Sequence, residues 1–132
     1  MSALLSAITD KSTIHSVHCA IMRGGTSKAI VFAAADLPAD PRSRDQLILA
    51  AFGSPDPRQI DGLGGADPLT SKVAIVGRST RSDIDVDYCF GQVGIASATI
   101  NYAVSCGNTA AAVALYAIHE RLLRVAEGPA RV

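Results

Sequence analysis

The sequence predicts a single α+β domain in which a mainly antiparallel sheet curves around one central helix. Four apolar or alternating segments precede one long segment rich in alanine and aliphatic residues. Strands and helices do not alternate regularly along the chain, which argues against a doubly wound parallel sheet. With 132 residues, of which 48% are apolar, the chain can bury one modest core and not two.

The first half of the chain predicts a hairpin and then a helix. Residues 17–22 and 29–33 are short apolar runs, and the glycine-containing segment 23–27 between them is typical of a turn between two strands. A helix is expected to begin within the proline-marked segment 38–44 and to stop at residues 53–55. The following segment, up to Thr70, is rich in glycine and proline and predicts an irregular, folded loop.

The second half predicts further strands and the central helix. Residues 72–76 and 86–95 are expected to form strands, and residues 98–104 are a third candidate. From Gly107 onward, apolar residues recur at helical spacing until Gly128 and Pro129. Because most of this helix is alanine and aliphatic, we expect it to be buried.

Charge and composition exclude several classes of function. Lysine plus arginine and aspartate plus glutamate number 12 each, so no overall positive field would attract nucleic acid or an anionic membrane surface. The longest apolar runs, 28–35 and 110–118, are much shorter than the about 20 residues of a spanning helix, and no signal peptide is recognisable. We therefore expect a cytoplasmic protein.

The cysteines and acidic residues predict neither a disulfide framework nor a metal site. Three cysteines without paired spacing are typical of neither disulfides nor zinc. Asp83, Asp85 and Asp87 alternate without a nearby histidine and are interpreted as a solvated strand face.

Cys106 is the first candidate for chemistry, because it lies where a strand leads into an apolar helix. Free backbone N–H groups and the helix dipole favour anions there and lower the pKa of a thiol. Cys106 could then exchange protons near neutral pH. The alternative is a small buried cysteine that only packs the start of the helix.

Two further segments contain groups that suit recognition of an anion. In the first, glycines at 62, 64 and 65 precede Thr70, Ser71 and Lys72. This segment is not a phosphate loop, because a phosphate loop leads into a helix and here a strand is expected after Lys72. Lys72, at the head of a buried strand, suits a general base, with a solvated strand-end lysine as the alternative. In the second, Arg23 and the glycine turn after it could hold a carboxylate or simply close a hairpin.

Six motifs occur in the order seen in one family of bacterial isomerases, between about residues 17 and 121. They are Met22-Arg23-Gly24-Gly25-Thr26-Ser27-Lys28, Gly53-Ser54-Pro55-Asp56, Gln59-Ile60-Asp61-Gly62-Leu63-Gly64-Gly65, Thr70-Ser71-Lys72, Asp85-Val86-Asp87-Tyr88 with Gln92-Val93, and Cys106-Gly107-Asn108. The chain resembles the family that contains 2-methylaconitate cis-trans isomerase, 4-oxalomesaconate tautomerase and methylitaconate delta-isomerase.

The resemblance implies a diaminopimelate epimerase-like fold of two similar domains with the active site between them, and it implies neither a cofactor nor a metal. The family's catalytic positions fall on Lys72 and Cys106. The residues expected to bind the substrate are Arg23, Gly24, Thr26, Ser27, Gly64, Gly65, Thr70, Ser71, Gly107 and Asn108. The expected substrate is a small unsaturated di- or tricarboxylic acid, isomerised by allylic proton transfer.

The length of the chain separates two hypotheses. Members of the family are much longer, so residues 1–132 are expected to be an N-terminal domain without the second domain. The second domain would normally cover apolar surface of the first, and apolar surface left exposed by its absence favours a homo-oligomer. The competing hypothesis is a truncated remnant without catalytic activity that only binds carboxylates or associates with another chain.

Overall fold

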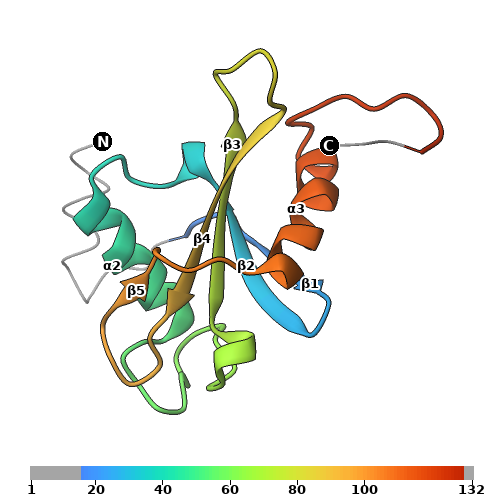
Figure 1. Ribbon diagram of the computed structural model, residues 1–132. Coiled ribbons are helices and arrows are strands. Elements are labelled where there is room, and N and C mark those ends of the chain that lie inside the picture. The colour runs from blue at the N-terminus through green and yellow to red at the C-terminus, as the bar shows by residue number, and fades with distance from the viewer. Residues whose placement is uncertain (1–15, 130–132) are drawn as a thin grey trace.

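The computed structural model describes residues 16–129, which form one five-stranded sheet with a helix on each face (Figure 1). The sheet order is β1-β2-β3-β4-β5, and three of the four pairings are antiparallel, whereas β2 and β3 are parallel. The strands are β1 (Ala20–Gly24), β2 (Ser27–Ala33), β3 (Lys72–Arg78), β4 (Val86–Val93) and β5 (Ile100–Asn101). The predicted α+β class with a mainly antiparallel sheet is confirmed.

The predicted hairpin is formed by β1 and β2. Gly24 pairs with Ser27, so Gly25 and Thr26 alone make the turn. Gly25 has φ 49°, a left-handed conformation that glycine adopts without strain. The hairpin therefore ends in a tight two-residue turn.

The connection from β2 to β3 contains the 3₁₀ turn η1 (Ala34–Asp36), helix α2 (Pro41–Phe52) and the 3₁₀ turn η2 (Pro68–Thr70). The side chain of Asp40 caps α2 by accepting hydrogen bonds from the backbone N–H and the hydroxyl of Ser43, at 2.9 and 2.7 Å. Gly53, with φ 79°, ends the helix. The predicted boundaries at the proline-marked start and the glycine stop are confirmed.

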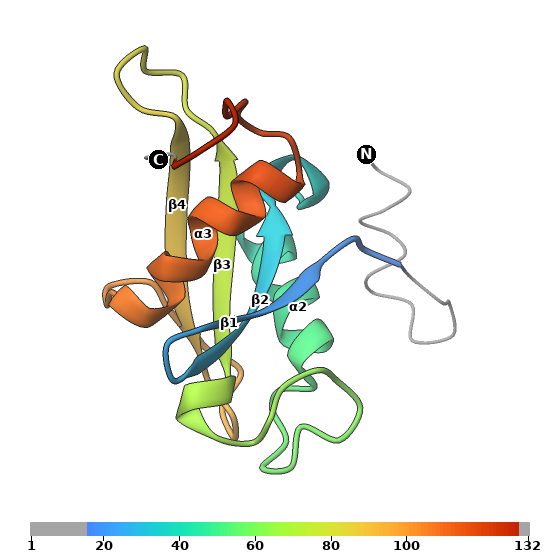
Figure 2. The same cartoon turned by 90° about the vertical axis from the view of Figure 1, so that its right-hand side faces the viewer.

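Alternation along the strands divides the core between the two faces of the sheet. Ile30 and Phe32 of β2 pack with Ile48 and Phe52 of α2 on one face. On the other face Val31 packs with α3 (Gly107–His119), which crosses the sheet and contacts β1, β2, β3 and β4 (Figure 2). The sheet therefore lies between the two helices.

Three expectations about the second half of the chain need correction. Helix α3 ends at His119, well before Gly128, because Arg121 turns back with φ 56°. It buries one face only, and Leu115 on the opposite face is 64% exposed. The third candidate strand, expected over 98–104, is reduced to β5, because its pairing with β4 involves two residues only.

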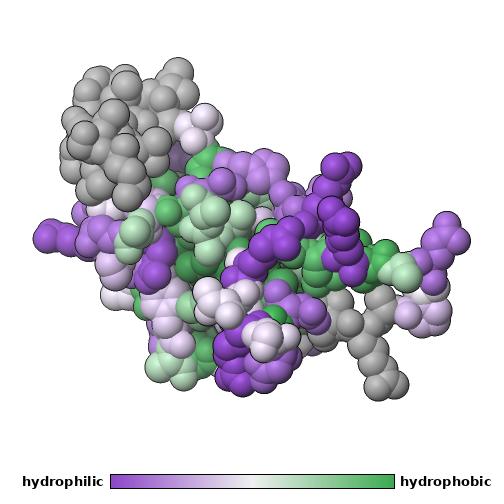
Figure 3. Space-filling view, turned by 90° about the horizontal axis from the view of Figure 1, so that it is seen from above, coloured by the Kyte–Doolittle hydropathy of each residue, from purple (hydrophilic) through white to green (hydrophobic). Residues whose placement is uncertain are grey.

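The surface over α3 is partly apolar. Figure 3 shows a hydrophobic stretch on the side of the molecule where α3 and the segment after it lie. Leu115 is 64% and Val125 40% exposed. Neither of the helices within residues 16–129 has the length and apolar character required to cross a membrane.

Candidate functional site

The candidate site forms where α3 begins beside the first residue of β3. Cys106 is the N-cap residue of α3, and its sulfur accepts a hydrogen bond from the backbone N–H of Thr109 at 3.4 Å. The hydroxyl of Thr109 donates to the same sulfur at 3.3 Å. A side chain at this position usually caps a helix through oxygen, so here sulfur takes the place of that oxygen.

Lys72 brings a buried ammonium group to this sulfur. Its Nζ lies 3.6 Å from Cys106 Sγ, although the two residues are 34 positions apart. Lys72 is 9% exposed, and its Nζ also lies 5.5 Å from the centre of the Phe90 ring. Within residues 16–129 no carboxylate forms an ion pair with Lys72. The thiol of Cys106 is therefore the nearest group that could balance the charge of Lys72.

Ser27 completes the surroundings of the sulfur. Parallel pairing of β2 and β3 places Ala29 beside Lys72, and Ser27 at the start of β2 lies with its Oγ 3.8 Å from Cys106 Sγ. Ser27 is 1% exposed. Three elements thus contribute polar groups to one sulfur atom.

These contacts favour the ionised form of Cys106. Burial opposes ionisation and is the largest influence, but the Thr109 hydroxyl and backbone N–H, followed by Ser27 and the positive charge of Lys72, outweigh it. The pKa of Cys106 falls from 9.0 to about 7. By contrast, burial raises the pKa of Cys19. A thiol with a lowered pKa exchanges protons more readily near neutral pH, which suits acid-base chemistry.

The hairpin turn packs closely against the start of α3. The side-chain amide of Asn108 donates to Thr26 Oγ1 at 3.1 Å. A Cβ on Gly24 would overlap the backbone carbonyl of Asn108, so this approach requires glycine. Arg23 donates to the carbonyl of Thr26 at 3.5 Å. The predicted residues of the turn and of the helix start are thus brought together.

In front of the helix start the space is open. A Cβ on Gly107 would meet no atom within 4 Å. The backbone N–H groups of Gly107 and Asn108 have no hydrogen-bond acceptor within residues 16–129. Free N–H groups at a helix start bind anions, so this position can receive a carboxylate.

The loop that contains Gly64 and Gly65 is held by Gln59, which is 1% exposed. Its Oε1 accepts hydrogen bonds from the backbone N–H of Ala66 at 2.7 Å and from the Ser71 hydroxyl at 3.0 Å, and its Nε2 donates to Ser54 Oγ at 3.1 Å. Gln59 lies within one of the six motifs, but no role was predicted for it from the sequence.

Contacts at both ends of this loop fix it further. Lys28 Nζ donates to the carbonyl of Leu63 at 3.0 Å, which ties the loop to the hairpin. Thr70 Oγ1 donates to the carbonyl of Asp67 at 3.1 Å, and Gly65 lies so close to Thr70 that a side chain would collide. The hydroxyls of Thr70 and Ser71 thus make hydrogen bonds inside the loop.

Thr109 is a second residue that the sequence analysis missed. A Thr three positions after an N-cap residue is where a backbone N–H is expected to donate to the cap. Cysteine is not among the usual N-cap residues, so the sequence did not indicate that Thr109 donates to the side chain of Cys106.

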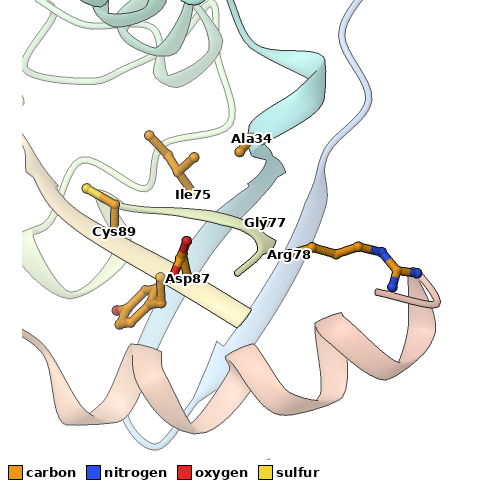
Figure 4. A pocket seen from close by; sticks show the side chains of 7 residues that line it. Ala34, Ile75, Gly77, Arg78, Asp87 and Cys89 are labelled. Atoms are coloured by element: carbon orange, nitrogen blue, oxygen red, sulfur yellow. The ribbon is translucent and has the colours of Figure 1, made fainter. Parts of the chain in front are cut away.

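Two cavities are lined by neither Lys72 nor Cys106. One, of about 240 Å³, is shown in Figure 4, where Ile75 and Cys89 lie on the side away from Arg78. The Arg78 side chain reaches the segment after α3 and donates to the carbonyl of Arg121 at 2.7 Å. The other, of about 400 Å³, lies between α3 and residues 83–88. Within residues 16–129 no cluster of three or more histidine, cysteine or acidic residues could hold a metal ion.

Comparisons with known proteins identify relatives over most of the chain. The family described as PrpF protein matches residues 14–132. The 3-methylitaconate isomerase of Eubacterium barkeri is 55% identical over 116 residues, which are 88% of this chain and 30% of that protein. The (4E)-oxalomesaconate Delta-isomerase of Novosphingobium sp. is 55% identical over 117 residues, which are 89% of this chain and 33% of that protein.

A solved structure shows the same fold. The crystal structure of methylitaconate-delta-isomerase superposes with a TM-score of 0.82 at 56% identity, over 84% of this chain and 29% of that one. The chain thus spans about a third of the length of these relatives. The predicted family resemblance is confirmed, and the chain belongs to the PrpF protein family.

Proposed function

We propose that this chain supplies Lys72 and Cys106 to the active site of a cofactor-independent isomerase acting on a small unsaturated di- or tricarboxylic acid. The observation that carries the proposal is the distance of 3.6 Å between Lys72 Nζ and Cys106 Sγ, beside an open helix start. The names of the relatives, which include isomerases of 3-methylitaconate and oxalomesaconate, support the substrate class and the type of reaction.

The reaction is a transfer of one proton between two carbons of the substrate. One of the two residues removes a proton from the allylic carbon, and the electron pair of the C–H bond spreads through the double bond into a conjugated carboxylate. The other residue returns a proton to a different carbon of the delocalised anion, and the double bond moves. Rotation within the anion before this step changes the cis or trans arrangement of the product. The proton count of the substrate is unchanged, so no oxidant or reductant takes part.

The open helix start binds the substrate in this proposal. The N–H groups of Gly107 and Asn108 hold a carboxylate and stabilise negative charge as it develops, for which about 3 kcal/mol per donor is typical in other enzymes. Thr26 and Gly24 of the hairpin turn contact Asn108 at this helix start, and Arg23 donates to the carbonyl of Thr26.

The remaining predicted binding residues have different positions. Gly64, Gly65, Thr70 and Ser71 lie in or beside the loop that Gln59 holds, where the hydroxyls of Thr70 and Ser71 donate to the Asp67 carbonyl and to Gln59 Oε1. Ser27 supports the sulfur of Cys106 and, being 1% exposed, has little surface for a substrate.

We also propose that the chain corresponds to the N-terminal domain of its relatives and that association completes the site. The coverage of about a third of their length and the exposed Leu115 and Val125 support this. Either a second domain or a second copy would remove that apolar surface from water. We expect the protein to work in the cytoplasm.

The test is isomerisation of 3-methylitaconate, followed by proton NMR in deuterated water, by the chain alone and by the chain joined to a second domain of the family. Cys106→Ser and Lys72→Met are each expected to lower turnover by about 100-fold or more. Cys89→Ser, a change of an exposed thiol outside the site, is the control and should leave turnover normal.

Near-normal turnover of both site variants, with an intact fold, would refute the assignment. Activity only in the joined form would show that this chain needs another domain. No activity in either form would favour the alternative of a carboxylate-binding remnant.

A further inference from the structure

Thr109 places two hydrogen-bond donors on the sulfur of Cys106. Its hydroxyl lies 3.3 Å and its backbone nitrogen 3.4 Å from Sγ, closer than Lys72 Nζ at 3.6 Å and Ser27 Oγ at 3.8 Å. Thr109 is 1% exposed, so water does not compete for its hydroxyl. Within a helix, a threonine hydroxyl often donates to a carbonyl of the preceding turn, and here it donates to the side chain of the N-cap residue instead.

We propose that Thr109 is a positioning residue that holds Cys106 as a thiolate directed at Lys72, an inference that rests on the proposed function. A neutral thiol is a weak acceptor, whereas a thiolate accepts charge-assisted hydrogen bonds that are roughly twice as strong as neutral ones. A hydroxyl fixed against the sulfur therefore stabilises the charged form more than the neutral form. The two donors also restrict rotation of the Cys106 side chain and so keep the sulfur 3.6 Å from Lys72 Nζ.

The other titratable groups that face Cys106 cannot replace this contribution. Lys72 of β3 contacts the sulfur, and Tyr88 of β4 is near enough for the charge of Cys106 to affect its pKa. Burial, followed by the charge of Cys106, raises the pKa of Tyr88 to about 12, so its phenol stays neutral through the neutral range. Among the influences that lower the pKa of Cys106, the Thr109 hydroxyl is the largest and Lys72 comes after both Thr109 contacts and Ser27.

Alkylation of Cys106 by iodoacetamide as a function of pH tests the proposal on the complete 132-residue chain. The modified peptide is quantified by mass spectrometry, so the reaction of Cys106 is measured separately from that of Cys19 and Cys89. Thr109→Val keeps the shape and the backbone N–H but removes the hydroxyl, and it should move the midpoint of the Cys106 profile upward by about one pH unit. Well below the midpoint this corresponds to about tenfold slower alkylation.

Thr109→Ser is the matched control, because it keeps the hydroxyl and should leave the midpoint near that of the parent chain. Cys89, in the same digest, should be unchanged in every variant. If Thr109→Val does not fold, Thr109→Ala, with a residue of high helix propensity, carries the same prediction.

Two results would overturn the proposal. An unchanged midpoint in the hydroxyl-free variant would show that the hydroxyl does not stabilise the thiolate. Equal shifts in Thr109→Val and Thr109→Ser would assign the effect to packing. The alkylation needs no substrate, so a shifted midpoint combined with no isomerase activity in either the lone or the joined form would contradict the proposed function and leave the role of Thr109 as a thiolate-stabilising residue intact.

Discussion

Gln59 holds the glycine-rich loop through one buried amide, and replacing it with methionine removes that amide at nearly constant length. Both side chains are unbranched, so the left-handed backbone at this position (φ 44°) is similarly strained in either variant. The change deletes three hydrogen bonds, to Ala66 N–H and to the hydroxyls of Ser71 and Ser54.

The decrease in the free energy of unfolding can be estimated from the three hydrogen bonds in turn. Ala66 is exposed, so its N–H can bind water, whereas Ser71 is 0% exposed and its hydroxyl loses the acceptor it has in the parent chain. A net hydrogen bond contributes about 1 kcal/mol, and an unsatisfied buried polar group costs about 1–3 kcal/mol. We expect Gln59→Met to lower the free energy of unfolding by about 3 kcal/mol.

Urea unfolding followed by circular dichroism measures this difference, provided that the slope of free energy against urea is the same for all variants. Gln46→Met makes the same chemical change at an exposed position of α2 and should alter stability by less than about 0.5 kcal/mol. Ser54→Ala removes one of the three bonds and should cost about 1 kcal/mol. If Gln59→Met costs no more than Gln46→Met, the loop is not held by this amide and the reasoning fails.

Two further predictions concern a buried phenol and the apolar surface. The hydroxyl of Tyr116 is buried without a hydrogen-bond partner within residues 16–129. Urea unfolding of Tyr116→Phe should therefore show a free energy of unfolding that is unchanged or up to about 1 kcal/mol higher. A variant that is clearly less stable than the parent chain would contradict this account. Sedimentation velocity should show a dimer or larger oligomer that Leu115→Glu shifts toward monomer, and a monomeric parent chain would count against association through this surface.

The elements that the sequence predicted well depend on local patterns. The turn before Thr26 needs glycine, the start of α2 carries an aspartate cap and a proline, and β4 alternates between two faces. Each of these signals lies within a few residues of the structure it specifies. The extent of β5 and the end of α3 were predicted less well, because each depends on a neighbouring element: β4 for β5, and the segment around Arg121 for α3.

The candidate site shows where local reasoning stops. Lys72 and Cys106 each stood out, one at a strand head and the other at a helix start, yet nothing local indicates that they meet. Their approach depends on the parallel pairing of β2 with β3 and on α3 crossing the sheet. Gln59 was missed for a related reason, because an amide in a glycine-rich loop is usually solvated and its burial is decided by distant partners.

The start of α3 divides its backbone donors between two anions in the proposed reaction. The N–H of Thr109 faces the sulfur of Cys106, whereas those of Gly107 and Asn108 remain for a substrate carboxylate. A helix start carries the equivalent of about half a positive charge, which is too little to balance a thiolate and a carboxylate together. The ammonium of Lys72, buried and 3.6 Å from the sulfur, adds one further positive charge. Lys72 therefore acts in this proposal both as a partner in proton transfer and as the cation that allows two negative groups to occupy one helix start.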